Sequence, residues 1–152
     1  MQNLTKRICA VFLALCMTLA LAPVVPVEAR EVRNVNIHLV DGENATIARQ
    51  PGGREAMPRE GQRLSEGNVL QTGWDTQIYL RVDQTSMVKM DESSRLQVAA
   101  ARSLLTLSIQ SGSALVDVET QPADYTLETR IGSTVMTVRG TLYIMGRRHT
   151  EV

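Results

Sequence analysis

Apolar and polar residues alternate with a period of two over the second half of the chain. Ile78, Leu80 and Val82 are separated by Tyr79 and Arg81. Because successive side chains of a strand point to opposite faces of a sheet, this alternation predicts strands with one buried and one exposed face. The same pattern recurs at Val88 and Met90; Leu96 and Val98; Leu105, Leu107 and Ile109; Ala114, Val116 and Val118; Tyr125, Leu127 and Thr129; Thr134, Met136 and Val138; and Leu142 and Ile144.

Short polar turns separate these segments at intervals of about 8 to 12 residues, which is typical of all-β folds. The turns occupy residues 71–73, 83–86, 91–94, 111–112 and 131–133. A helix is conceivable only over residues 96–105, where three alanines follow one another, but the apolar positions there form no helical stripe. We predict a strand, a loop and a strand in that region, and no βαβ crossover in the chain.

Aromatic residues make up only 3% of the chain, so the core has to be built from aliphatic side chains. Val, Ile, Leu and Thr fill a narrow coil of short strands well, whereas a wide sandwich core usually contains larger side chains. We therefore predict an all-β fold, specifically a β-solenoid or β-roll of short strands. A β-sandwich is the alternative.

The start of the chain has the layout of a secretory signal peptide. Lys6 and Arg7 precede an apolar run over residues 8–22, and a Val-Glu-Ala motif follows at residues 27–29. We predict a signal-peptide helix with cleavage after Ala29, and an uncleaved membrane anchor is the alternative. The run spans about 22 Å as a helix, against a hydrocarbon layer of about 30 Å. The cleaved chain would be extracytoplasmic, in the periplasm, at the cell surface or secreted, and would not be an integral membrane protein.

Both cysteines, Cys9 and Cys16, lie within this leader. The mature chain would therefore have no disulfide, no thiol nucleophile and no thiolate metal site. The predicted organisation is a signal peptide at residues 1–29, a polar N-terminal segment at 30–44, a β domain at 45–146 and a polar tail at 147–152. Within the β domain, residues 45–48 are expected to form only a short strand.

Composition and charge exclude several classes of protein. The chain has 152 residues, which fits one domain. It has 16 Lys and Arg against 16 Asp and Glu, whereas a general nucleic-acid-binding protein needs a basic surface, so no nucleic-acid partner is predicted. With 43% hydrophobic residues, the chain does not have the composition of an intrinsically disordered protein.

Four segments, in order, resemble the FecR domain, which is named for the regulator of ferric-citrate transport. They are residues 64–73, 78–96, 111–118 and 127–141, and the resemblance covers about residues 45–145, most of the mature chain. The first segment is similar to the family's opening L-x-x-G-D-x-L-x-T-G, and the last resembles its V-R-G-T signature. The resemblance implies an extracytoplasmic β-rich domain that is solenoid-like in the regulators. It also implies a structural role for the motif residues Thr72, Gly73, Arg139, Gly140 and Thr141.

The chain departs from the family pattern in three respects. The resemblance implies a cytoplasmic segment that binds a sigma factor, but only seven residues precede the apolar run, so that role is not expected here. Members of the family usually continue with further strands beyond the position of Thr141, and a proline is common where this chain has Arg130. The missing strands predict an open sheet edge, a truncated reading frame, or a partner that completes the fold by strand addition.

Candidate catalytic groups are few. His38 and His149 lie in polar segments outside the predicted strands, and no Gly-x-Ser-x-Gly elbow provides a nucleophile. Asp117 and Glu119 are two residues apart on one strand, so they share its outer face and do not flank a cleft. We predict a protein that is not an enzyme and has no metal or other cofactor.

Two further side chains are candidates for special roles. Arg139 has five donors and is predicted to act as a structural clamp on carbonyls or a carboxylate, beside a bulge or close backbone approach at Gly140. Trp74 lies next to a Thr-Gly turn. It either plugs one end of the core or is exposed as an interaction site, stacked on a sugar or anchoring a protein interface.

Together these features predict an exported, non-catalytic, FecR-like domain that mediates protein–protein interaction or sensing at the cell envelope. Its partner would be an envelope or extracellular protein. The alternative is a structural or binding module associated with the cell wall or a polysaccharide, with a cell-wall glycan as its ligand.

Overall fold

The computed structural model describes residues 33–119 and 124–146, and the secondary structure of these residues consists of strands joined by turns. The all-β prediction is confirmed. The predicted signal peptide at residues 1–29 and the predicted tail at 147–152 lie outside the described residues. In the described ranges no helix has the length and apolar character needed to cross a membrane.

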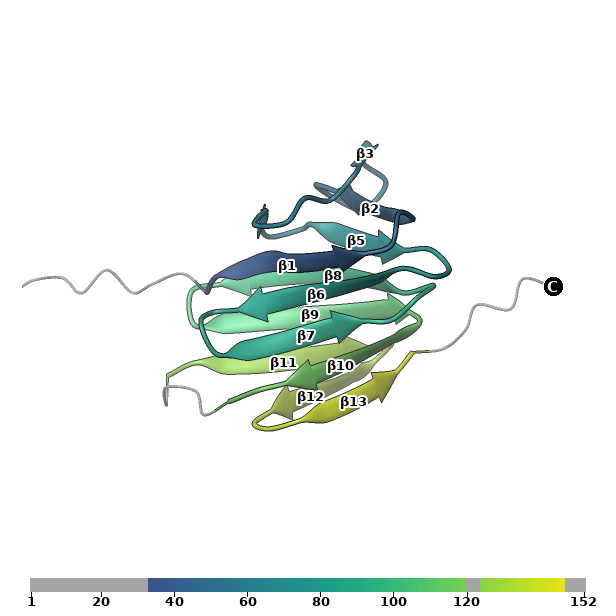
Figure 1. Ribbon diagram of the computed structural model, residues 1–152. Helices are drawn as coiled ribbons and strands as arrows, with labels where there is room; N and C mark the ends of the chain where they lie inside the picture. Colours follow the sequence, from purple (N-terminus) through teal and green to yellow (C-terminus); the bar gives the residue numbers. More distant parts are fainter. Residues whose placement is uncertain (1–32, 120–123, 147–152) are drawn as a thin grey trace, which may run out of the picture.

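The strands form two open sheets, A and B, that lie face to face (Figure 1). Sheet A contains, in spatial order, β13 (Leu142–Met145), β10 (Ser113–Asp117), β7 (Ser86–Met90), β6 (Gln77–Val82), β1 (Val35–Asp41) and β4 (Arg63–Leu64). Sheet B contains β12 (Thr134–Val138), β11 (Thr126–Ile131), β9 (Leu104–Ser111), β8 (Arg95–Ala101), β5 (Val69–Thr72), β2 (Ala45–Ala48) and β3 (Glu55–Ala56). Among the described strands, neighbours are antiparallel except β9 and β11, which are parallel.

The chain moves back and forth between the two sheets. The β6–β7 hairpin belongs to sheet A and the β8–β9 hairpin to sheet B, after which β10 returns to A, β11 and β12 to B, and β13 to A. The connections therefore gather at two opposite ends of the strands (Figure 1). We call these the Trp74 end, with the connections after β1, β5, β7 and β9, and the Arg33 end, with those after β6 and β8.

The core lies between the sheets and is built from aliphatic side chains. Alternation predicts that three residues of β6 point inward, and all three are fully buried: Ile78, Leu80 and Val82. So are the inward residues of the neighbouring strands, among them Val88, Met90, Val98, Leu105, Leu107, Val116 and Leu127. Removing these side chains from water is the main source of stability, at about 25 cal/mol for each Å² of apolar area.

The prediction that residues 30–44 form a polar segment outside the domain is wrong. They contain β1, which lies between β6 and β4 in sheet A, and its residues Val35 and Ile37 are fully buried. The alternation is hidden in the sequence because the register shifts between Ile37 and Leu39, so the inward phase does not continue. His38 consequently lies on a strand and is exposed, not in a loose polar segment.

Residues 96–105 form two strands joined by a tight turn, as predicted. β8 ends at Ala101 and β9 begins at Leu104, and Arg102 in the turn has a positive φ of 46°. The predicted short strand at residues 45–48 is β2. Both features could be predicted from local sequence patterns, without knowing which strands pair with each other.

Candidate functional site

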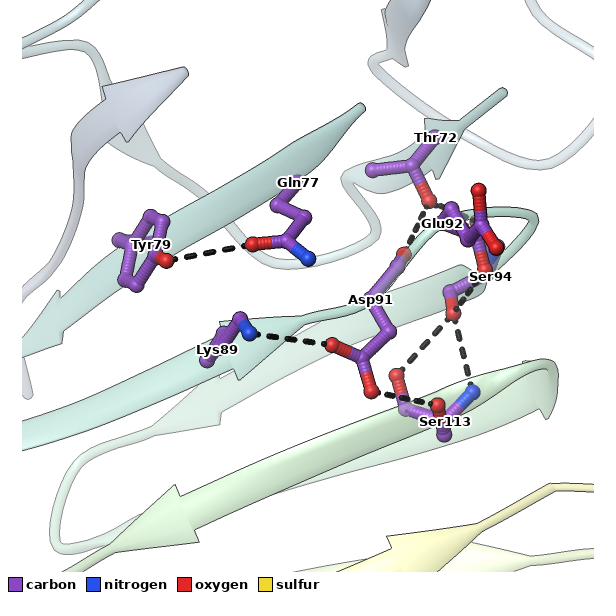
Figure 2. Close-up of polar contacts among 8 residues, drawn as sticks. All are labelled: Thr72, Gln77, Tyr79, Lys89, Asp91, Glu92, Ser94 and Ser113. Carbon is purple, nitrogen blue, oxygen red and sulfur yellow. Dashed lines mark hydrogen bonds and ion pairs between the residues drawn. The ribbon is translucent and has the colours of Figure 1, made fainter. Parts of the chain in front are cut away.

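The Trp74 end is held by a network of hydroxyl groups that joins both sheets (Figure 2). The Thr72 hydroxyl donates to the carbonyl oxygen of Asp91 at 2.6 Å and accepts from the Ser94 backbone N–H at 2.9 Å. The Ser94 hydroxyl donates to the Ser113 carbonyl oxygen at 3.0 Å, and the Ser113 hydroxyl donates to the Asp91 carboxylate at 2.8 Å. Lys89 pairs with the same carboxylate at 3.4 Å.

The contacts of this network indicate a structural role. Thr72 and Ser94 are buried, and the bonds connect β5 of sheet B to the β7–β8 turn and to β10 of sheet A. The Ser113 hydroxyl meets a carboxylate and not an imidazole that could take its proton. Thr72 therefore helps to connect the two sheets.

Gly73, the next residue in the chain, makes a close backbone approach. A Cβ at this position would lie 2.7 Å from the Cβ of Asn44, which is closer than real Cβ atoms come. The Gly73 N–H donates to the Asn44 carbonyl oxygen, and its own carbonyl oxygen accepts from the Ser93 N–H at 3.0 Å. The β1–β2, β5–β6 and β7–β8 connections are thereby fixed to one another.

Trp74 projects from these connections into solvent, with 72% of its surface exposed. The interpretation of Trp74 as a plug for the core is wrong. Its backbone is held on both sides, since the Asn44 side-chain amide donates to the Trp74 carbonyl oxygen at 3.4 Å and the Asp75 N–H donates to the Glu92 carboxylate at 3.0 Å. Asp75 has a positive φ of 56°. A large apolar side chain is thus displayed on a turn with a defined conformation.

The clamp predicted at Arg139 has no partner among the described residues. Arg139 and Gly140 form the bend between β12 and β13, and Arg139 is exposed and makes no hydrogen bond or ion pair with any other described residue. A Cβ at Gly140 would meet nothing within 4 Å, so no close approach exists there. The hydroxyl of the neighbouring Thr141 donates to the exposed Asp117 carboxylate at 2.7 Å.

The arginine that acts as a clamp is Arg33, at the opposite end of the strands. Its side chain is 0% exposed. Its Nε donates to the Asp83 carboxylate at 2.7 Å, and its Nη1 donates to the Thr126 carbonyl oxygen at 2.9 Å. The guanidinium carbon lies 4.9 Å from the centre of the Tyr125 ring. Arg33 therefore ties the start of β1 to the β6–β7 turn and to the start of β11.

The role of Arg33 was not predicted from the sequence, although the alternation along β1 contains a signal for it. Arg33 is in phase with Val35 and Ile37, the two buried residues of β1, so its side chain points to the inner face. A charged residue in the inward phase requires a partner, because an isolated buried charge is costly. That partner, Asp83, is 50 residues away in the sequence.

Catalytic and metal-binding groups are not gathered in the described part of the chain. His38 lies on the outer face of sheet A with its Nε2 3.4 Å from the Arg81 guanidinium, and His149 lies outside the described residues. Asp117 and Glu119 are both exposed. The described ranges contain no group of three or more His, Cys, Asp or Glu residues arranged to hold a metal ion.

β12 and β13 form an edge of the two sheets that is unpaired among the described residues. In the described part, β12 is the last strand of sheet B and pairs only with β11, and β13 is the last strand of sheet A and pairs only with β10. The two strands lie at the same side of the molecule (Figure 1). β12 contains no charged residue, proline or glycine, and its Val135 is 46% exposed.

The opposite edge is built differently. β3 and β4 have two residues each, and each contains a charged residue, Glu55 and Arg63. Pro51 precedes β3 and Pro58 follows it closely. Short strands, charges and prolines are the features that prevent a sheet edge from pairing with another chain, and β12 has none of them.

Comparison of the chain with protein-family models, with curated proteins and with solved structures gives no match. The resemblance to the FecR domain therefore stays a prediction from the sequence.

Proposed function

We propose that this chain is a non-catalytic protein-binding module of the cell envelope, which binds its partner by strand addition at the edge formed by β12 and β13. The extracytoplasmic location rests on the signal-peptide pattern of residues 1–29. The binding mode rests on the open edge.

The edge at β12 and β13, which has no pairing strand among residues 33–119 and 124–146, supports a protein partner in preference to other ligands. An edge strand presents backbone N–H and C=O groups at a repeat of about 3.3 Å per residue, and another extended polypeptide matches that repeat along its whole length. The uncharged β12 stands in contrast to the short, charged strands at the opposite edge. An edge left without protection is suited to a partner that covers it.

The experiment adds charges to the edge while preserving the pairing of β12 with β11. Val135 lies opposite Arg130, and Thr137 lies opposite Glu128. The double variant Val135→Glu/Thr137→Lys therefore gives each new charge an oppositely charged neighbour across the strands, which leaves the fold stable. A partner strand would have to approach these two charges and remove water from them.

Ala99→Lys/Ala101→Glu is the matched control, because it places the same two charges on the outer face of the interior strand β8. Envelope proteins captured by the unmodified chain are identified and purified. Each is then titrated against the unmodified chain, the edge variant and the β8 variant. We expect the edge variant to bind at least about tenfold more weakly, which corresponds to about 1.4 kcal/mol, and the β8 variant to bind normally. The proposal would be contradicted if the edge variant bound the partner as tightly as the unmodified chain does. It would also be contradicted if the edge variant and the β8 variant lost the same amount of affinity.

A glycan-binding module is the second candidate, and exposed Trp74 is the observation that favours it. An indole face on a rigid turn can stack on a sugar ring, and the exposed Asn44 and Glu92 beside it could hydrogen-bond to hydroxyl groups. Under this function, Trp74→Ala abolishes binding to insoluble cell-wall polysaccharide. Under strand addition, the same variant binds its protein partner normally.

A further inference from the structure

A groove with a volume of about 1410 Å³ lies at the side of the molecule opposite β12 and β13. One wall comes from the β2–β3 hairpin, within residues 47–57, and the other from residues 59–68, which include β4. Pockets for small molecules usually have volumes of about 300 to 1,000 Å³. The size of this groove fits a segment of a chain better than a small metabolite.

Arginine dominates the charge of the groove. Its lining contains four arginines, Arg49, Arg54, Arg59 and Arg63, and two acidic residues, Glu60 and Glu66. None of these arginines forms an ion pair with a carboxylate in the described part of the chain. A guanidinium binds carboxylates through two parallel hydrogen bonds, so four arginines without partners are suited to an anionic ligand.

Hydrogen bonds fix the two walls before any ligand binds. The Gly61 N–H donates to the Ile37 carbonyl oxygen at 2.7 Å, and the Ile37 N–H donates to the Gln62 carbonyl oxygen at 2.9 Å. The buried side chain of Asn68 donates to the Arg49 carbonyl oxygen at 3.2 Å. Preorganised walls reduce the entropy that a ligand would lose in ordering them.

The apolar part of the lining distinguishes between anionic ligands. Met57 is 69% exposed, and Ile47 and Ala56 lie beside it in the lining. A methionine side chain adapts to apolar groups of different shapes. The lining contains no aromatic residue, whereas rings are the usual platforms for sugars and for the bases of single-stranded nucleic acids. These features favour a peptide over an anionic polysaccharide.

We propose that this groove binds an acidic peptide segment. Its Glu or Asp side chains pair with the four groove arginines, and an apolar side chain of the peptide contacts Met57. The site lies at the other side of the molecule from β12 and β13, and the inference does not depend on the strand-addition proposal.

The test uses a fluorescent peptide of alternating glutamate and leucine and measures its anisotropy on titration with the protein. We expect saturable binding at low salt that weakens strongly at high salt, because charge pairs at a surface are screened. The variant Arg49→Gln/Arg63→Gln is expected to bind at least about tenfold more weakly. Met57→Ser is expected to bind a few-fold more weakly, which separates apolar contact from charge alone.

The matched control is Arg81→Gln/Arg130→Gln, which removes the same charge from two exposed arginines on the outer faces of sheets A and B. It is expected to bind the peptide normally, and thermal unfolding checks that all variants are folded. No binding at low salt, or equal weakening by the groove and control variants, would overturn the inference. Tighter binding of polyphosphate or of an acidic polysaccharide than of the peptide would overturn it as well.

Discussion

Replacing Arg33 with alanine removes a fully buried guanidinium that connects three parts of the chain. The variant loses a charge-assisted hydrogen bond of 2.7 Å to Asp83, one of 2.9 Å to the Thr126 carbonyl oxygen, and the contact with the Tyr125 ring. Hydrogen bonds to charged groups contribute about 1.5 to 3 kcal/mol, and a desolvated cation over a ring about 1 to 2 kcal/mol.

Two effects reduce the sum of these contributions. Burial of the Arg33 guanidinium carries a desolvation cost that the variant no longer bears, and its Nη2 has no hydrogen-bond partner within the part of the chain that the structure describes. Asp83 is 27% exposed and keeps the Asn34 N–H at 3.0 Å, so its carboxylate is not left as a fully buried charge. We therefore expect a net loss of about 3 kcal/mol in the free energy of unfolding.

Thermal unfolding followed by circular dichroism measures this loss. With an unfolding entropy of about 2.1 cal/mol/K per residue over the 110 described residues, 3 kcal/mol lowers the Tm by about 13 °C. The control Arg81→Ala removes an exposed arginine and is expected to change stability by less than about 0.5 kcal/mol. A double-mutant cycle with Asp83→Asn should give a coupling of at least about 1 kcal/mol. A loss below about 1 kcal/mol for Arg33→Ala, or a coupling near zero, would refute the clamp.

Two further predictions concern turns. Gly112 has a φ of 79°, and a Cβ there would overlap Ser94, so Gly112→Ala is expected to lower the stability to urea by at least about 2 kcal/mol. Gly132 also has a positive φ, of 57°, but an added Cβ there would have no atom within 4 Å. Gly132→Ala should therefore lower the stability by only about 1 kcal/mol. Equal losses of stability in Gly112→Ala and Gly132→Ala would argue against the overlap with Ser94. Arg139→Ala is expected to leave the Tm unchanged, and a clear fall would mean that Arg139 has a structural partner after all.

The strands could be predicted from the sequence because each one follows a local rule. Ile78, Leu80 and Val82 are buried because successive side chains of a strand must alternate between faces, whatever the strand pairs with. The rule fails at β1, where the register shift after Ile37 interrupts the alternation. A bulge depends on the partner strand, here β6, and the partner cannot be identified from the segment alone.

Candidate interaction residues were harder to predict because their roles depend on distant contacts. Arg139 and Arg33 are the same residue type near a strand end, yet of the two only Arg33 meets a carboxylate among the described residues, and that carboxylate comes from another turn. From the sequence, Trp74 could either fill a core or face solvent. It faces solvent because three connections pack around Asn44 and Gly73. The exposed edge likewise follows from the order of strands in each sheet.

The contrast between the two sides of the molecule limits how far assembly can proceed. Filaments of stacked sheets need two compatible ends on every subunit, so that each added copy offers a fresh docking position. Under the proposed strand addition, β12 and β13 would each accept one added strand, while β3 and β4, short and charged, terminate the far side. Association through this edge would therefore stop once each sheet has gained one strand and would not continue into a polymer.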